Sequence, residues 1–453
     1  MLITHGLVVC MTEPDRVIED GALLVRDGLI ADIGPTRELL ASYGDPRLPG
    51  HETDVIDADG KLVLPGNICA HTHFYGAFAR GMAIPGQPAA DFVQILQRLW
   101  WKLDRGLDLE GARYSALVCL ANAIRHGTTS LIDHHASPNA IDGSLSVIGQ
   151  AVRQAGLRAA LCYEVTDRNG MAGAQAGIRE NVRFAQEIRQ QPSEFIRAAF
   201  GLHALLTVGD DTLEQSVEAA RESRVPLHLH VAEGQADQAH SLSEYHMRVI
   251  ERLLLHGALT SQTICAHCIH VDAHEIELLA GQNACVTHQP RSNMNNAVGT
   301  APVICMLDAG VRVGLGNDGF SNNAFAEMKF ADLLQRHTQA DPRAMGADKV
   351  IHMAYSNNAR IAALFWGQPV GALQIGAHAD IVLADYRPFT PLTASNAPWH
   401  ILFGMDGSEI TDTICAGRLL MRNRQLLTLD EAEIAARARE IALETWARVQ
   451  AMD

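Results

Sequence analysis

Histidine and carboxylate side chains that could bind a metal ion end several strand-like runs of this sequence. His71 and His73 lie two positions apart at the end of the first run, so an extended strand would point both imidazoles to one face. His230 ends a later run, and Glu233 follows it by three residues. Imidazoles and carboxylates are common ligands of zinc and related divalent ions. The pattern therefore predicts a metal site with a carboxylate beside it.

Two further candidates end later runs of the chain. His267 closes the run Ile264-Cys-Ala-His267, and Asp318 follows the apolar run that begins at Val313. An Asp before Gly is, taken alone, more often a turn former than a ligand. The interpretation as a metal site rests on how these residues occur together. Five candidate side chains all stand at the ends of predicted strands, namely His71, His73, His230, His267 and Asp318.

The elements that would position these side chains are short apolar runs separated by several helical stretches. We predict eight buried parallel strands, at 62–73, 128–135, 158–165, 196–204, 226–232, 263–267, 284–288 and 311–317. Alternation of this kind over about 250 residues is typical of a (β/α)8 barrel, whose active site lies at the carboxyl ends of its strands. The predicted fold class is therefore α/β, with a TIM-like barrel.

Strand-rich segments flank the barrel region on both sides. A hairpin is predicted around Asp27-Gly28, and strand-like runs return after residue 369. We expect residues 1–62 and 369–425 to form one small composite β-sandwich domain. Residues 63–368 would then form the catalytic barrel, and residues 426–453 a C-terminal helix.

Composition narrows the class of protein further. The 453 residues are 47% hydrophobic, which supports a large folded core, and the formal net charge of −16 argues against nucleic-acid binding. The N-terminus lacks a basic segment, and no apolar run reaches 18 residues, so we expect neither secretion nor a membrane span. The nine Cys are irregularly spaced, which favours reduced thiols and a cytoplasmic location.

Together these motifs resemble the amidohydrolase superfamily. The resemblance runs from Leu64-Pro-Gly-Asn-Ile-Cys-Ala-His-Thr-His, through His-Val-Ala-Glu, Ala-His-Cys and Asn-Asp-Gly, to Gly376-Ala-His-Ala-Asp-Ile-Val-Leu. The sequence is most similar to the branch of cyclic-amidine deaminases and chlorotriazine hydrolases. His134-His-Ala-Ser-Pro, Thr166-Asp-Arg-Asn and Arg291-Ser-Asn-Met-Asn-Asn resemble the SsnA-type aminohydrolases within it.

The resemblance implies one divalent ion, for which we expect zinc, with Fe²⁺ or Mn²⁺ as alternatives. Its implied ligands are His71, His73, His230 and Asp318. The resemblance also implies that Glu233 shuttles protons and that His267 hydrogen-bonds the attacking water. Asp318 would carry the second proton.

A single ion is expected because the fourth strand lacks the residues that bridge paired ions. Its run at 196–204 contains no Lys, Asp, Glu or Cys, and Glu164 is the one nearby carboxylate that could substitute. The predicted substrate-binding residues follow strands one, three, four and seven or lie in the long segment 74–126. They are Phe74, Tyr75, Trp100, Trp101, Arg168, His203 and Asn293. Aromatic rings would stack on a flat substrate, and Arg168 would meet a carbonyl or carboxylate.

The predicted function is metal-dependent hydrolytic deamination of an N-heterocyclic aromatic compound of purine, pterin, pyrimidine or triazine type. The alternative is hydrolysis of a ring amide or of another leaving group on a similar ring, because the same activated water attacks in both cases. A non-catalytic scaffold is a different class, but such proteins lose ligands, whereas each ligand position here is filled. We expect a small heterocyclic partner, no nucleic acid or membrane partner, and a homo-oligomer of two or more subunits.

Overall fold

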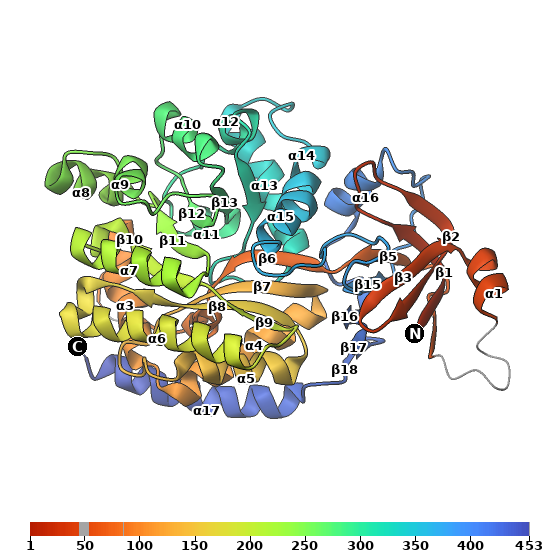
Figure 1. Ribbon diagram of the computed structural model, residues 1–453, viewed down its shortest axis with the longest axis horizontal. Helices are drawn as coiled ribbons and strands as arrows, with labels where there is room; N and C mark the ends of the chain where they lie inside the picture. The colour runs from red at the N-terminus through yellow and green to blue at the C-terminus, as the bar shows by residue number, and fades with distance from the viewer. Residues whose placement is uncertain (45–53, 85, 453) are drawn as a thin grey trace.

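The structure is a computed structural model that describes residues 1–44, 54–84 and 86–452. Its larger part is a parallel barrel (Figure 1). The barrel strands are β6 (Asn67–Thr72), β7 (Thr128–His135), β8 (Arg158–Val165), β9 (Ile196–Ala198), β10 (Phe200–Ala204), β11 (Leu227–Val231), β12 (Thr263–His267), β13 (Cys285–His288) and β14 (Arg312–Leu315). β9 and β10 together form the fourth predicted strand, so the barrel has the eight predicted strand positions.

The barrel closes where the end of β14 meets β6. A parallel bridge joins Thr72 to Asp318, and the Asn317 amide donates to the His71 carbonyl at 2.9 Å. The His73 amide donates in turn to the Asp318 carbonyl, also at 2.9 Å. These backbone contacts between β6 and the end of β14 form a seam that places three predicted metal ligands, His71, His73 and Asp318, next to one another.

Helices surround the strands and bury their outward faces. The longer ones are α4 (Leu109–Arg125), α5 (Ser144–Ala155), α6 (Gly170–Gln190), α7 (Asp210–Ser223), α8 (Gln235–Tyr245), α10 (Ala273–Gly281) and α13 (Ala324–Gln339). The shorter ones are α9 (Val249–Leu255), α11 (Pro290–Asn295), α12 (Val303–Asp308), α14 (Ala347–Ile351), η5 (His352–Asn357) and α15 (Asn358–Ala362).

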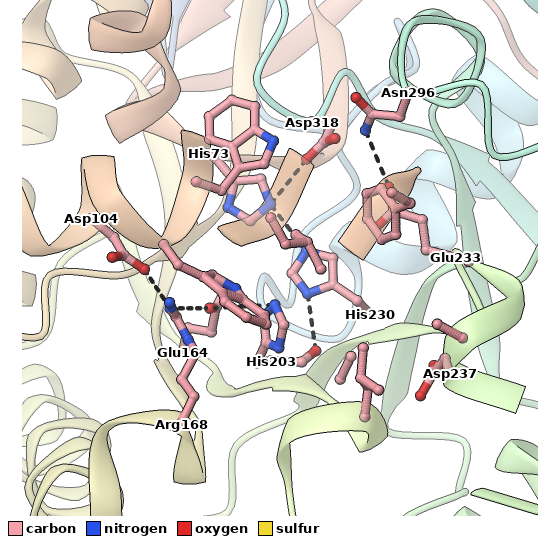
Figure 2. A pocket seen from close by; sticks show the side chains of 18 of the residues that line it. His73, Asp104, Glu164, Arg168, His203, His230, Glu233, Asp237, Asn296 and Asp318 are labelled. Atoms are coloured by element: carbon pink, nitrogen blue, oxygen red, sulfur yellow. Dashed lines mark hydrogen bonds and ion pairs between the residues drawn. The ribbon is translucent and has the colours of Figure 1, made fainter. Parts of the chain in front are cut away.

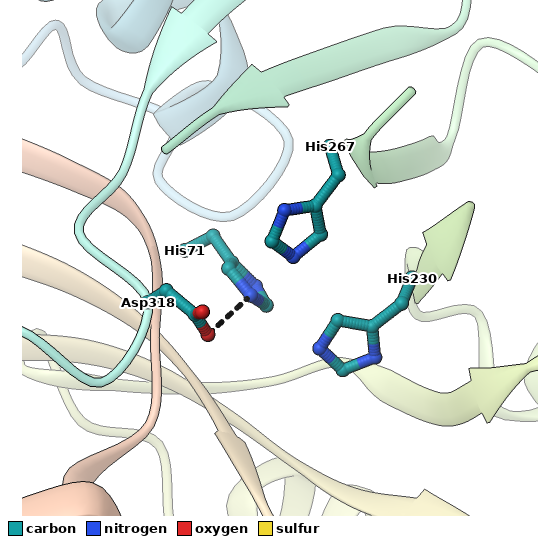
Figure 3. Close-up of side chains that lie close together, drawn as sticks. All are labelled: His71, His230, His267 and Asp318. Carbon is teal, nitrogen blue, oxygen red and sulfur yellow. Dashed lines mark ion pairs between the residues drawn. The ribbon is translucent and has the colours of Figure 1, made fainter. Parts of the chain in front are cut away.

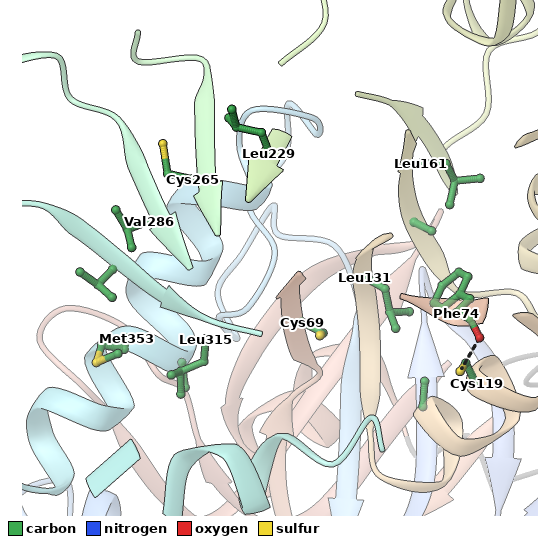
Figure 4. Packing of buried hydrophobic residues seen from close by; sticks show 14 of the residues in the cluster. Cys69, Phe74, Cys119, Leu131, Leu161, Leu229, Cys265, Val286, Leu315 and Met353 are labelled. Carbon is green, nitrogen blue, oxygen red and sulfur yellow. Dashed lines mark hydrogen bonds between the residues drawn. The ribbon is translucent and has the colours of Figure 1, made fainter. Parts of the chain in front are cut away.

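Side chains alternate between two cores along the strands. Leu131 of β7 and Cys265 of β12 point outward into the cluster beneath the helices (Figure 4). Their neighbours Ile132 and Ile264 point inward and pack with Trp366 in the barrel interior. The same alternation sends His230 of β11 inward, since Leu229 belongs to the outer cluster.

The segment between β6 and α4 forms a cover over one side of the barrel mouth. It consists of η1 (Phe74–Ala79), α2 (Phe92–Ile95), η2 (Leu96–Trp100) and α3 (Trp101–Gly106). Two further short helices follow strands at the same end, namely η3 (Asp167–Asn169) after β8 and η4 (Leu205–Thr207) after β10.

Both ends of the chain build a second sheet beside the barrel (Figure 1). Its strands are β1 (Leu2–Val9), β2 (Val17–Arg26), β3 (Leu29–Pro35), β4 (Val55–Asp57), β5 (Leu62–Pro65), β15 (Ile381–Ala384), β16 (Ile410–Cys415), β17 (Arg418–Arg422) and β18 (Gln425–Leu426). β5 pairs antiparallel with β15 and thereby joins the two halves. Residues of both halves, among them Ile3, Val63 and Leu383, share one buried core.

The first predicted strand is divided between the two sheets. Residues 62–65 belong to the sheet of the chain ends, and only residues 67–72 enter the barrel. The short helix α1 (Thr36–Tyr43) follows β3, and α16 (Ala397–Gly404) precedes β16. The C-terminal helix is α17 (Glu431–Gln450), which lies against the barrel, where the indole of Trp446 donates to the Phe78 carbonyl at 2.8 Å. Across the described parts of the chain, we find no helix with the length and apolarity needed to cross a membrane.

Candidate metal centre and active site

The ends of four strands bring potential metal ligands together inside the barrel mouth (Figure 3). His71, His230, His267 and Asp318 each offer one ligand atom, and these atoms all lie within 4.8 Å of one another. His73 joins them, since its Nε2 is 3.0 Å from Asp318 Oδ1 and 3.0 Å from His230 Nε2. All five residues are buried. The structure therefore places every predicted metal ligand in one cluster.

The hydrogen bonds of His73 and His230 leave room for a cation. His73 Nδ1 donates to the His134 carbonyl at 2.6 Å, and His230 Nδ1 donates to the His203 carbonyl at 2.9 Å. A carbonyl only accepts, so in its neutral form each ring would carry a lone pair on Nε2, and these two nitrogens lie 3.0 Å apart. Burial lowers the pKa of His73, but Asp318 and Glu164 raise it to about 9. The surroundings thus favour a positive charge at this point, which a divalent ion would supply.

His71 is held in the ligand orientation from behind. Its Nδ1 lies 2.9 Å from Nε2 of the fully buried His228, while its Nε2, on the cluster side, has no hydrogen-bond partner. The ring pair is consistent with a hydrogen on His71 Nδ1 and a lone pair on Nε2. Burial lowers the pKa of His71 to about 3 and those of His228 and His230 well below their usual value. Neutral imidazoles of this kind are the form that binds metal ions.

His267 faces both the cluster and Glu233. Its Nδ1 donates to Asn293 Oδ1 at 2.8 Å, and its buried Nε2 lacks a hydrogen-bond partner and lies 3.5 Å from Glu233 Oε2. The backbone of His267 adopts a φ of 73°, and that of Asp318 a φ of 56°. Left-handed backbone at non-glycine residues costs free energy and is concentrated at functional sites. This geometry suits His267 either as a metal ligand or as a hydrogen-bond partner of a water molecule.

The two carboxylates of the centre have opposite electrostatic surroundings. Burial raises the pKa of Glu233 to about 7, although His267 opposes the shift and Asn296 Nδ2 donates to its Oε1 at 3.3 Å. For Asp318, burial is outweighed by His71 and His73, so its pKa lies well below the usual range. Ser292 also donates to Asp318. Asp318 is therefore an anion suited to a cation, and Glu233 can gain or lose a proton near neutral pH.

A pocket opens above the cluster (Figure 2). His73, His230, Glu233 and Asp318 line its floor. Its walls include the predicted substrate-binding residues Tyr75, Trp100, Trp101, Arg168 and His203. Phe92 and Leu96 of the covering segment add apolar surface. The mixture of aromatic and polar walls is typical of a small-molecule site.

Two predicted pocket residues lie elsewhere. Phe74 is fully buried in the core between strands and helices, where Cys119 donates to its carbonyl, so it does not line the pocket. Asn293 is also fully buried, and its side chain orients His267 instead of facing the pocket. Neither residue lines the pocket in the described structure, because a position next to a ligand in the sequence does not determine the direction of a side chain.

Arg168 lines the pocket, but carboxylates already bind it. Its Nη2 donates to Asp104 in a short ion pair and lies 3.3 Å from Glu164 Oε1. The guanidinium also lies 5.3 Å from the centre of the Trp101 ring. Asp104 is not predictable as part of this site, because nothing in the spacing of the 74–126 segment links it to Arg168. Glu164 is the last residue but one of β8, and this position near a strand end was the sequence signal that could place it at the site.

Other functional neighbours lacked a clear sequence signal. Ser292 in α11 and Asn296 at the C-cap of that helix are four residues apart, a helical spacing that could have indicated one common face. His228 precedes His230 by two residues and therefore shares its face of β11. A two-residue spacing alone does not distinguish a candidate metal ligand, such as His230, from a residue that orients another ligand, such as His228.

A second group of possible ligands overlaps the first. His73, His134, Glu164 and His230 also offer atoms within 4.8 Å of one another. Two of the four belong to the first cluster, and the Arg168 guanidinium lies beside Glu164. A second dication would compete for the same ring nitrogens next to an existing positive charge.

Comparison with known proteins agrees with this geometry. A sequence model described as the amidohydrolase family matches residues 62–420, and one described as a bacterial imidazolonepropionase-like composite domain matches residues 21–45. A 5-methylthioadenosine/S-adenosylhomocysteine deaminase of Syntrophobacter fumaroxidans is 31% identical over 449 residues, covering 98% of this chain and 97% of the relative. A 5'-deoxyadenosine deaminase of Methanosarcina mazei is 30% identical over 453 residues, covering 99% of both.

Solved structures share the whole architecture. An adenosine deaminase from Xanthomonas campestris with bound zinc has a TM-score of 0.86 at 24% identity, covering 98% of both chains. The zinc complex of atrazine chlorohydrolase TrzN from Arthrobacter aurescens has a TM-score of 0.81 at 21% identity, covering 97% of this chain and 99% of that one. The family match spans most of the chain, and the relatives align over nearly its full length. The chain belongs to the amidohydrolase family.

Proposed function

We propose that the protein is a metal-dependent hydrolytic deaminase of an N-heterocyclic aromatic substrate. The observation that carries this proposal is the convergence of imidazole nitrogens and the Asp318 carboxylate beneath a pocket with aromatic walls, with Glu233 at the same floor. The deaminase names of relatives that align over nearly the full chain support it.

The residues present fit a single divalent ion. His71, His73, His230 and Asp318 would hold it, because the Nε2 atoms of His73 and His230 lie 3.0 Å apart and His71 Nε2 has no hydrogen-bond partner. We propose zinc, because its preferred nitrogen and oxygen ligands match this set and the similar solved structures contain zinc. When bound, such an ion lowers the pKa of a coordinated water molecule toward about 7.

The protein side chains would then move the protons. Glu233 accepts a proton from the attacking water and delivers it to a ring nitrogen, which makes the neighbouring ring carbon more electrophilic. Asp318 accepts the second proton and passes it to the departing amine. His267 orients the water and stabilises the charge that develops on its oxygen. Overall, one amine and one water become one carbonyl and one ammonia.

Adenine nucleosides are the first substrates to test. The two relatives described above are named as deaminases of adenosine derivatives, and the pocket offers aromatic rings to stack on a purine. Pterins, pyrimidines and aminotriazines present the same reacting group, a ring carbon that bears an amine. Hydrolysis of a ring amide remains the second candidate, because the same water and the same Glu233 would carry it out.

A panel of aminated heterocycles tests the proposal with the zinc-loaded protein. Deamination releases one ammonia per product, whereas ring opening adds the mass of water and releases none. We expect ammonia from at least one ring system in the wild type and none above background from Glu233→Gln. Water addition without ammonia would favour the second candidate, and inactivity toward every ring system would refute both.

We further propose a cytoplasmic homo-oligomer. The resemblance to the amidohydrolase superfamily supports the oligomer, and the nine free cysteines, eight of them buried, support a reducing compartment. Light scattering of the purified protein would test the oligomer, and a monomer at micromolar concentration would contradict it.

A further inference from the structure

The walls of the pocket carry an excess of negative charge. Of the described residues that line it, five bear a carboxyl group and a single one, Arg168, bears a guanidinium. The five are Asp104, Glu164, Glu233, Asp237 and Asp318. Even a divalent ion in the cluster leaves the pocket negative, and most of these groups are buried, where charges are poorly screened.

The positive charge of Arg168 is already matched. Asp104 and Glu164 are 1% and 3% exposed, and both lie against the same Nη2 of Arg168. The guanidinium also lies over the Trp101 ring. A substrate anion that approached Arg168 would have to displace a carboxylate or lie beside two of them. Buried charges that lose their partners are strongly destabilised, so neither option is favourable.

Other contacts show that these carboxylates are built into the walls. His134 Nδ1 lies 3.3 Å from Glu164 Oε2, and His203 Nε2 lies 3.9 Å from Glu164 Oε1. Asp237 accepts the Ala232 amide at 2.8 Å. Glu164 and Asp237 therefore each have partners within the wall of the pocket.

We propose that this wall is a charge filter that restricts the pocket to heterocycles without an anionic substituent, and so to uncharged or cationic substrates. The proposal rests on the proposed deaminase function and narrows it by substrate class. It excludes nucleotides and rings with a free carboxylate at the end remote from the amine. It also changes the predicted role of Arg168, which would hold two carboxylates in place instead of binding a substrate carboxylate.

Substrates that differ only in charge test the filter. Adenosine-5'-carboxamide and adenosine-5'-carboxylate are nearly isosteric, and pterin-6-carboxamide and pterin-6-carboxylate form a second pair. At pH 8 we expect kcat/KM of the zinc-loaded protein to be at least about 100-fold higher for the amide of a reactive pair, because like charges in a buried site repel strongly. 5'-Amino-5'-deoxyadenosine, a cation, should react at least as well as adenosine. A ratio near one, or a preference for the carboxylate, would overturn the proposal.

A variant that removes one carboxylate from the pocket wall tests whether the wall causes the preference for the amide substrate. Asp104→Asn keeps the shape of the side chain and should lower the amide-to-carboxylate ratio at least tenfold, chiefly through KM for the carboxylate. Asp211→Asn removes an exposed carboxylate of α7 that does not line the pocket, and it should leave the ratio unchanged. An unchanged ratio in Asp104→Asn, or an equal change in Asp211→Asn, would overturn the proposal.

Binding separates failure of the filter from failure of the proposed function. If no ring system releases ammonia, the deaminase function fails, but calorimetric Kd values of the same pairs still test the filter. We then expect tighter binding of each amide than of its carboxylate. Equal Kd values, or binding of neither member of any pair, would refute the charge filter.

Discussion

At the scale of single residues, the centre depends on which ring nitrogen carries a hydrogen. Backbone carbonyls hold His73 and His230 with Nε2 turned toward the cluster, whereas His71 relies on a side chain, His228. Behind His228, Cys162 Sγ lies 3.9 Å from its Nδ1 and donates to the Asp133 carbonyl at 3.4 Å. This chain of buried polar groups orients one ligand without contacting the ion or the substrate.

Removal of His228 should therefore weaken metal binding. We expect His228→Ala to lower zinc affinity by about 10- to 100-fold, since the loss of groups that orient metal ligands has effects of this size. His228→Gln, whose amide oxygen can still accept from His71, should lose less. Competition with a zinc chelator measures the affinity, and an unchanged affinity in His228→Ala would show that His71 needs no such support.

Glu233 should control the acid limb of the pH profile. A base must be ionised to accept a proton, and burial raises the pKa of this carboxyl to about 7. kcat/KM should therefore fall as the pH decreases through a value at or below about 7, because a nearby cation would lower that pKa. Glu233→Gln should reduce kcat by about 10²- to 10⁴-fold while zinc content stays near one per chain. A pH-independent rate between pH 5 and 8 would exclude this role.

At the scale of elements, the seam between β6 and β14 positions three predicted ligands at once. Gly316 makes this seam possible, because a Cβ there would lie 2.6 Å from the His71 carbonyl oxygen and 2.8 Å from its amide nitrogen. Backbone atoms cannot rotate away as side chains do. A side chain at position 316 would therefore push β14 and β6 apart where the barrel closes.

Gly316→Ala should lower both stability and metal content. We expect a lower Tm and less than one zinc per chain after purification, because the shift displaces His71. Gly281→Ala is a matched control at the end of α10, since a Cβ there meets no neighbouring atom within 4 Å. Wild-type Tm and zinc content in Gly316→Ala would mean that the seam is more tolerant than its geometry indicates.

The strands were predictable from the sequence where a continuous apolar run was the dominant signal. Buried parallel strands are short continuous apolar runs, so β7, β8 and β12 occupy the predicted positions residue for residue. The run at 62–73 was predicted as one strand because both of its halves are apolar and buried. Only the tertiary structure shows that it leaves one sheet at Pro65 and enters another at Asn67. The exact division of the chain into 1–62 with 369–425, 63–368 and 426–453 stays a prediction.

The candidate metal ligands were predictable from the sequence, whereas part of the pocket wall was not. Ligands at strand ends converge in any parallel barrel, so their types and positions sufficed. Pocket walls depend instead on how loops return across the mouth, and Asp104 reaches Arg168 from 64 positions away in the chain. No local pattern encodes such a contact.

At the scale of the whole molecule, the barrel, the seam and the pocket meet at one candidate metal site. The fourth strand has no Lys to bridge a pair of ions, and the overlapping ligand group around Glu164 lies beside Arg168. The described structure therefore favours one catalytic ion, with His267 and Glu233 available for proton transfer.

Titration of the metal-free protein with zinc, followed by ammonia release from a reactive heterocycle, tests this account most directly. We predict no ammonia without metal, a linear rise up to one equivalent of zinc per chain, and no further rise beyond it. Full activity without metal would contradict the metal-dependent mechanism. Activity that continues to rise to a second equivalent would contradict the single-ion site and the roles proposed for His267 and Glu233.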